Sequence, residues 1–227
     1  MNNLQKIAGV SAIFEALIYI VTFVYFGTFW AYPSEGTASE KMVYLAENQF
    51  VFSMIYFLMY AVFGIFLAVL VVGLYEKLRS ANNPIVKVGS VFGIVWVVLV
   101  IASGMLANIG LSHAINLMDL SSEKAFDMWR MISVLIESLG GGNELVGGLW
   151  VLLVSIAALK AEEFPRGLNY LGIVVGIFGI ATIYPDEVIT EIFGIIQIIW
   201  FVWLGISMLG QSNANKSIQP TANASAD

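Results

Sequence analysis

The best candidates for chemistry are two glutamates in apolar surroundings. Glu15 lies in the run VSAIFEALIYIV, nine residues after Lys6. With a helical rise of about 1.5 Å per residue, Glu15 lies roughly 13 Å beyond Lys6, near the middle of a bilayer. A carboxyl at that depth is expected to be neutral or hydrogen-bonded, because ionised groups inside a membrane are costly. We predict a proton site at Glu15 with Tyr60, which lies at comparable depth; a neutral carboxyl that only joins two helices is the alternative.

The second glutamate, Glu144, follows the glycine-rich stretch ESLGGGN and opens an apolar segment. The three glycines Gly140, Gly141 and Gly142 are predicted to form a hinge, because glycine adopts positive φ at little cost. Asn143 is suited to cap the new helix, and Glu144 to lie near the positive end of its dipole. This stretch also makes sense as a helix start that needs no ligand.

Other polar residues are expected at the depth of Glu144. Asn108 ends the third apolar segment, Gln197 lies in the last, and Tyr56 lies in the second. Together with Asn143 and Glu144, they are predicted to form a ligand-binding pocket open to the outside, because small-molecule sites are mostly apolar with a few convergent polar groups. A purely structural polar layer between helices explains the same residues, and both interpretations stay open.

Composition argues against several other kinds of site. The chain has no cysteine and one histidine, which excludes thiolate metal sites, bis-histidine haem and HExxH zinc chemistry. The sequence contains no Walker A loop, no GxSxG motif and no basic patch suited to nucleic acid. We therefore expect no metal, no cofactor and no nucleic-acid partner, and an enzyme is the least favoured class of function.

The elements that must position these residues are membrane helices. Apolar residues make up 59% of the 227-residue chain and charged residues 11%, whereas a soluble domain has roughly 45–50% and about 25%. A segment of about 20 apolar residues spans a bilayer. Six such segments are predicted, near 5–29, 50–76, 86–110, 143–160, 168–185 and 190–210. The sequence therefore predicts an all-α membrane protein, a six-transmembrane-helix bundle in the lipid bilayer.

One further segment, 121–139, is too short and too charged to span. Its sequence, SSEKAFDMWRMISVLIESL, places apolar and charged residues on opposite faces of a helix. We expect an amphipathic helix on the membrane surface or across the mouth of the bundle. Ser121 is predicted to cap this helix, with Glu123 favourable in its first turn.

The distribution of basic residues predicts the orientation, because cytoplasmic loops are enriched in lysine and arginine. Seven fall on one side: Lys6, Lys77, Arg79, Lys87, Lys160, Arg166 and Lys216. Three fall on the other: Lys41, Lys124 and Arg130. Both termini are therefore predicted to be cytoplasmic, with acidic loops outside the inner (plasma) membrane.

The tail 211–227 is polar and lacks an apolar face, so we expect it to be disordered. Its ending, QPTANASAD, resembles the translated read-through of an integron gene cassette. This resemblance implies a bacterial accessory gene and a tail with no function of its own.

The run GGGNELVGGLW and the cytoplasmic turn that follows it carry a second resemblance. Gly142, Glu144 and Gly148, the pair Pro165-Arg166 and the pair Leu171-Gly172 are similar to features of a bacterial six-helix inner-membrane family, domain of unknown function 4386. The resemblance covers roughly residues 4–209 and implies the same topology. It implies no activity, cofactor or catalytic residue.

Two functions are compatible with these observations. The first is a protein that binds or transports a small molecule through the outward-facing pocket. The second is a non-catalytic accessory protein whose glycine-lined helices pack against a second copy of the chain or another membrane protein. The first requires Glu15 or Glu144 to titrate, whereas the second requires only volume and a hydrogen bond.

Overall fold

A computed structural model describes residues 3–79, 83–141, 144–184 and 186–217, and all its regular elements are helical. The elements are α1 (Asn3–Val24), the π-helical turn η1 (Tyr25–Phe29), α2 (Ala38–Glu47), α3 (Gln49–Tyr56), η2 (Phe57–Val62), α4 (Phe63–Leu78), α5 (Pro84–Leu117), α6 (Ser122–Ile136), η4 (Glu137–Gly141), α7 (Leu145–Lys160), α8 (Arg166–Ala181) and α9 (Glu187–Ser217).

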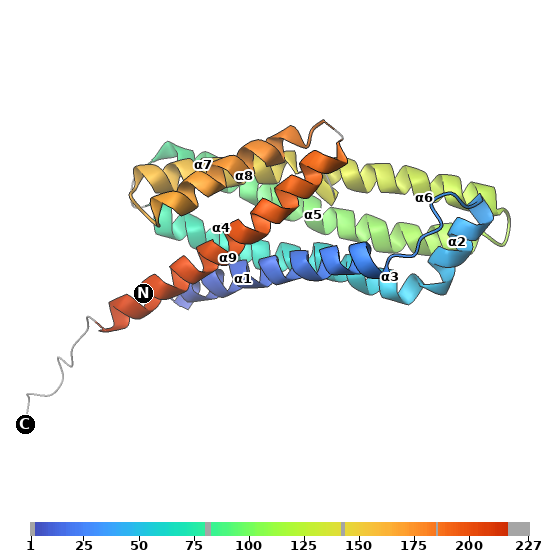
Figure 1. Ribbon diagram of the computed structural model, residues 1–227, viewed down its shortest axis with the longest axis horizontal. Helices are drawn as coiled ribbons and strands as arrows, with labels where there is room; N and C mark the ends of the chain where they lie inside the picture. The colour runs from blue at the N-terminus through green and yellow to red at the C-terminus, as the bar shows by residue number, and fades with distance from the viewer. Residues whose placement is uncertain (1–2, 80–82, 142–143, 185, 218–227) are drawn as a thin grey trace, which may run out of the picture.

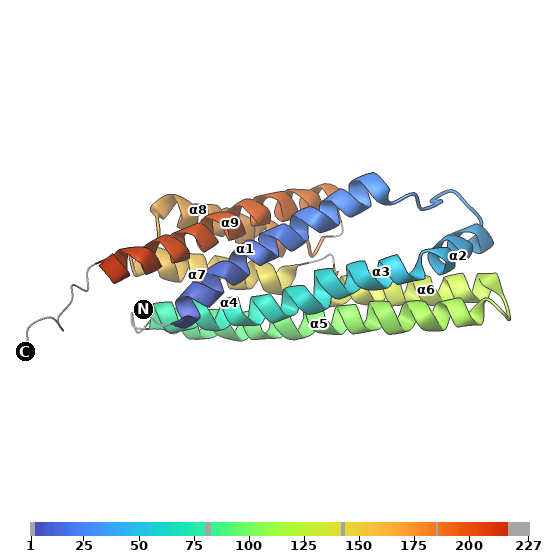
Figure 2. The ribbon, with the colours of Figure 1, turned by 90° about the horizontal axis from the view of Figure 1, so that it is seen from below.

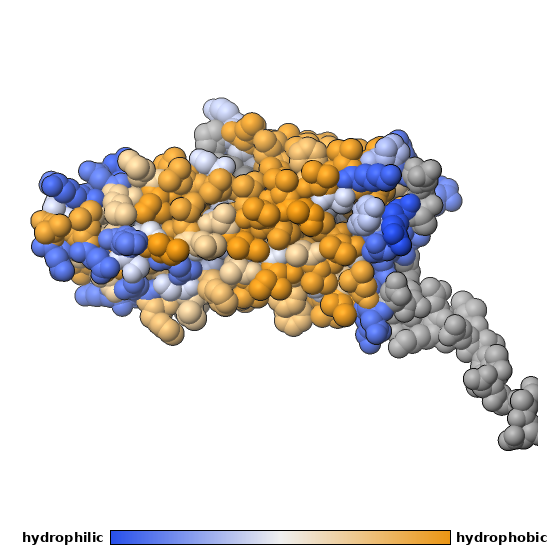
Figure 3. Space-filling view, turned by 180° about the vertical axis from the view of Figure 1, so that it is seen from behind, coloured by the Kyte–Doolittle hydropathy of each residue, from blue (hydrophilic) through white to orange (hydrophobic). Residues whose placement is uncertain are grey.

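Five helical segments are long and apolar enough to cross a membrane. They are Asn3–Phe29, Gln49–Leu78, Pro84–Leu117, Ser122–Lys160 and Glu187–Gly210, and the apolar helix Arg166–Ala181 is shorter. A continuous apolar surface lies between two hydrophilic ends (Figure 3). Large apolar side chains such as Phe14 and Ile65 are exposed. The protein is therefore a multi-pass all-α membrane protein, which confirms the predicted fold class.

The long helices pack side by side in a closed ring. Following contacts from neighbour to neighbour gives the order α1, α4, α5, α7, α8, α9 and back to α1. The beginning of α1 and the end of α9 lie at the same end of the bundle (Figure 1). Glycines permit the close approach: a Cβ on Gly93 would lie 2.7 Å from the Trp150 ring, and one on Gly176 would lie 2.5 Å from Leu152 Cβ.

Helix bounds differ from the expectations mainly at the ends. With 34 residues, α5 is about 51 Å long, well beyond the roughly 30 Å of a bilayer core. Helix α9 continues to Ser217, seven residues into the segment predicted to be disordered. Adding a residue to an existing helix is much easier than nucleating one, which accounts for such extensions. The rest of the predicted tail, 218–227, lies outside the described residues.

The amphipathic helix is present as α6, with the predicted cap. Ser121 Oγ accepts a hydrogen bond from Lys124 N at 3.3 Å. Helix α6 does not lie across the mouth of the bundle; it runs alongside the C-terminal part of α5 (Figures 1 and 2). The reason is its apolar face, since Trp129 and Ile136 are buried and Ile132 packs onto Gly110.

Helix α2 packs against α6 and was not predicted. It begins with a capping box in which Glu40 N donates to Thr37 Oγ1 at 3.3 Å and Thr37 N donates to Glu40 Oε2 at 2.7 Å. The backbone and hydroxyl hydrogen bonds from Thr37 lower the pKa of the Glu40 carboxyl. The pattern Thr37-x-x-Glu40 was the sequence signal for this helix.

Candidate functional site

A cavity of about 230 Å³ lies inside the bundle where α1, η2 and α9 meet the start of α7. Its walls are mostly apolar and aromatic, with a single carboxyl group. The lining residues are Ile18, Tyr19, Thr22, Phe23, Phe26, Met59, Tyr60, Phe63, Val100, Gly140, Glu144, Thr190, Phe193 and Gly194.

The break between α6 and α7 positions Glu144. Gly140 has φ of 107°, a conformation that glycine adopts at little cost, so the predicted hinge residue is where the chain turns. Glu144 occupies the position before α7, and its backbone N–H donates to Thr182 Oγ1 at 2.7 Å. Thr182 Oγ1 in turn donates to the Gly179 carbonyl at 2.7 Å. Because Thr182 ties this backbone to α8, the Glu144 side chain is left to line the cavity.

No cationic side chain among the described residues forms an ion pair with the Glu144 carboxyl. The ion pairs among the described residues are Lys77–Glu163, Arg79–Glu76 and Arg130–Asp127, all elsewhere. The indole of Trp96 is near enough to interact with this carboxyl, but the geometry falls short of a hydrogen bond. Glu144 Oε2 and Trp96 Nε1 are both buried without a hydrogen-bond partner in the described part of the chain. A partner for Glu144 is therefore expected from whatever occupies the cavity.

Two tyrosines in the cavity wall lie within electrostatic range of the candidate carboxyls. Tyr60 lines the cavity and lies within electrostatic range of Glu144. Tyr19 also lines the cavity and lies within electrostatic range of both Glu144 and Glu15. Glu15 is fully buried, and neither of its oxygens has a hydrogen-bond partner among the described residues. Sequence reasoning missed Tyr19 as a residue of this cavity. The proton role of Glu15 and Tyr60 stays a prediction.

The other residues of the predicted pocket lie elsewhere. Gln197 is fully buried and does not line the cavity. Asn108 Nδ2 donates to the Gly104 carbonyl of its own helix at 3.3 Å. Tyr56 lines a separate outer groove with Trp129. Of the four predicted ligand-binding residues that the structure describes, only Glu144 lines this cavity.

Two residues of the predicted site, Asn143 and Gly142, lie outside the described residues. Gly141 ends η4. The capping role predicted for Asn143 therefore stays a prediction.

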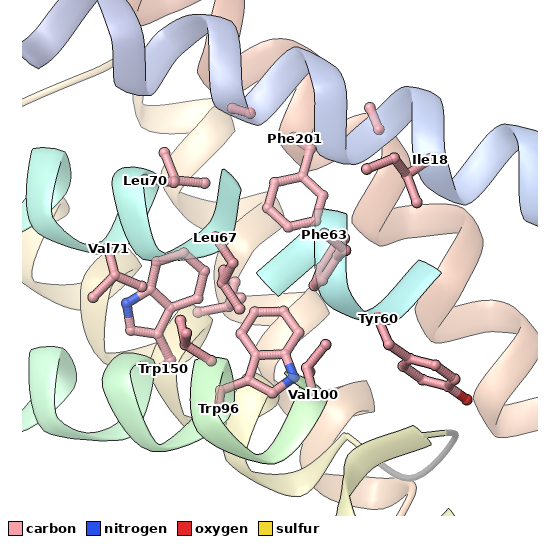
Figure 4. Packing of buried hydrophobic residues seen from close by; sticks show 14 of the residues in the cluster. Ile18, Tyr60, Phe63, Leu67, Leu70, Val71, Trp96, Val100, Trp150 and Phe201 are labelled. Carbon is pink, nitrogen blue, oxygen red and sulfur yellow. The ribbon is translucent and has the colours of Figure 1, made fainter. Parts of the chain in front are cut away.

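An aromatic cluster closes the bundle beside the cavity (Figure 4). Phe63, in the cavity wall, packs edge-on against Trp96 with ring centroids 5.7 Å apart. The ring centroids of Trp96 and Trp150 lie 5.6 Å apart, and those of Trp150 and Trp200 lie 5.9 Å apart. These rings fill the interior that the helices enclose, so the cavity does not continue past them.

The aromatic wall is a feature that sequence reasoning missed. Tyr19, Phe23 and Phe26 recur at helical spacing along one face of α1 and η1 and all line the cavity. That spacing was visible in the sequence. It was not informative by itself, because aromatic residues at the same spacing also face lipid.

The Thr182 bridge gives a first testable expectation. Replacing the fully buried Thr182 with valine removes both hydrogen bonds and leaves the Glu144 N–H without its acceptor, which costs about 1–3 kcal/mol of folding free energy. We expect the valine variant to melt below wild type in detergent. Thr182→Ser keeps the hydroxyl and serves as the matched control. Equal melting of the two variants would show that the bridge does not stabilise the fold.

Comparisons of the chain with protein-family models, with curated proteins and with solved structures found no match. The resemblance to the domain of unknown function 4386 and that of the tail to an integron cassette stay predictions.

Proposed function

We propose that this protein binds, and carries across the inner membrane, a small and largely apolar molecule held in the cavity beside Glu144. The observation that supports the proposal is the cavity itself, which is about 230 Å³ in volume and lined mainly by apolar side chains. An apolar cavity of about 150 Å³ is already large enough to bind benzene. Glu144, Thr22 and Thr190 add the few polar groups that fix the orientation of a ligand.

The orientation of the chain belongs to the same proposal. Lys77 pairs with Glu163 at 2.9 Å and lies 5.3 Å from the centroid of the Phe164 ring. It belongs to the last turn of α4, and α4 ends near the end of the bundle where the chain begins (Figure 2). The excess of lysine and arginine there supports a cytoplasmic location for both termini. The start of α7, where Glu144 lines the cavity, would then lie at the outer, acidic side. An accessory protein that works only through helix packing remains the alternative, and it requires no ligand.

The proposal predicts that filling the cavity abolishes ligand binding. Met59 lines the cavity, whereas Met105 on α5 is 60% exposed on the outside of the bundle. We expect Met59→Trp to remove binding and Met105→Trp to leave it unchanged, because only the first indole enters the cavity. The measurement is the thermal shift of detergent-purified protein with two aromatic probes of about ten non-hydrogen atoms, tert-butylbenzene and phenyltrimethylammonium.

A ligand at a hundredfold excess over its Kd should stabilise wild type by about 2.7 kcal/mol. A shift that persists in Met59→Trp would place the ligand elsewhere. If neither probe shifts the wild-type protein at concentrations up to their solubility, the cavity does not bind molecules of this class, and the accessory role is favoured.

A further inference from the structure

We infer that the cavity selects an organic cation, and that binding of the cation displaces a proton from Glu144. This inference rests on the proposed function and names its ligand class. It starts from the charge of the wall: Glu144 is the one acidic residue among the lining residues, and lysine, arginine and histidine are missing from that set. When ionised, the Glu144 carboxylate therefore has no cationic side chain beside it among the described residues of the wall.

The rest of the wall suits a cation equally well. Tyr19 packs edge-on against Phe63 with centroids 5.6 Å apart and lies 6.4 Å from Phe23. Phe26, Tyr60 and Phe193 complete the aromatic part of the lining. The faces of aromatic rings attract ammonium groups, and aromatic cages recognise quaternary ammonium ligands in this way. A neutral apolar ligand would gain the same contact area without that attraction.

Charge balance then determines the exchange. In the absence of a cation, an ionised Glu144 carboxylate would lie in an apolar wall without a counter-ion, so the carboxyl holds its proton. When an organic cation binds, the O–H bond of Glu144 breaks, the proton passes to bulk water, and the carboxylate pairs with the ammonium group. One positive charge replaces another, and the net charge of the site does not change.

The neighbouring groups leave Glu144 as the residue that titrates. Trp96 of α5 and Tyr60 of η2 face it, and Tyr19 of α1 lies within range. An indole does not titrate, and phenols are neutral well above pH 7. Thr182 of α8 and Thr190 of α9 are hydroxyls. The other carboxyl whose charge reaches Tyr19 is Glu15, which does not line the cavity.

The test compares two probes of almost identical shape, phenyltrimethylammonium and neutral tert-butylbenzene. Phenyltrimethylammonium carries no ionisable proton, so any proton released on binding comes from the protein. Titration calorimetry in two buffers of different ionisation enthalpy counts that proton. We expect wild type to prefer the cation about tenfold or more, and to release close to one proton per cation bound under acidic conditions. In the pH range in which Glu144 is protonated before the cation binds, the affinity for the cation should increase up to tenfold for each unit by which the pH rises.

Two variants identify which carboxyl group releases the proton. Glu144→Gln should lose the preference for the cation and the proton release while still binding tert-butylbenzene, and its melting curve checks that it is folded. Glu15→Gln should behave as wild type. Proton release that disappears in Glu15→Gln but not in Glu144→Gln would overturn the assignment.

The wild-type protein alone also tests the inference. Equal affinity for the two probes, or cation binding that does not depend on pH, would overturn it and leave the proposed function intact. If neither probe binds, the proposed function fails as well.

Discussion

Replacing Gly148 with alanine is expected to destabilise the protein strongly. A Cβ at this position would lie 2.6 Å from the carbonyl carbon of Gly179 and 2.6 Å from the backbone nitrogen of Ile180. Both are backbone atoms of the α8 region, so no side chain can rotate away, and α7 would have to separate from α8. Overpacking costs about 1–3 kcal/mol in ordinary cores and occasionally more, and we expect the upper end here or beyond.

The matched control is Gly210, which lies seven residues before the end of α9. A Cβ there meets no atom of the described residues within 4 Å, so Gly210→Ala should leave the melting temperature unchanged or raise it slightly, through the higher helix propensity of alanine. Thermal unfolding of both variants in detergent is the measurement. A Gly148→Ala protein that melts with wild type would mean that the contact between α7 and α8 is looser than described.

Replacing Glu15 with methionine is expected to have the opposite effect, a gain in stability. Glu15 is 0% exposed, and neither carboxyl oxygen has a hydrogen-bond partner among the residues that the structure describes. A buried polar group left unsatisfied costs about 1–3 kcal/mol, and methionine fills a similar volume without that penalty. At roughly 2–4 °C per kcal/mol for a chain of this size, the melting temperature should rise by several degrees.

Glu15→Gln is the control, because glutamine keeps the shape and leaves two polar atoms in the same apolar surroundings. It should melt close to wild type. Unfolding temperature and ligand transport, measured on the same variants, separate the two roles considered for this residue. A more stable methionine variant that has lost transport would support a proton site at Glu15. A less stable one would show that the carboxyl is hydrogen-bonded in the folded protein and would contradict the expected gain.

Several features of this protein follow from its sequence because they depend on local chemistry. The long apolar segments predict membrane helices, since backbone groups in lipid must be hydrogen-bonded within the segment. Ser121 predicts the start of α6 by the chemistry of its hydroxyl. Gly140 has a positive φ, which is the backbone conformation that the glycine-rich stretch was expected to allow. Glu15 and Glu144 are visible in the sequence because charged residues in apolar runs are rare.

Only the tertiary structure decided which helices are neighbours and which residues share the cavity. In a membrane, the side of a helix that faces lipid is as apolar as the side that faces the core, so the amphipathic signal that orients soluble helices is lost. In α1, Phe14 is exposed and Ile18, one turn later, is buried, yet their chemistry does not distinguish them. The closed ring of helices brings Tyr19 and Glu144 to the same cavity and leaves Gln197 and Asn108 outside the cavity wall. Those groupings depend on contacts between segments far apart in the chain, which no local pattern encodes.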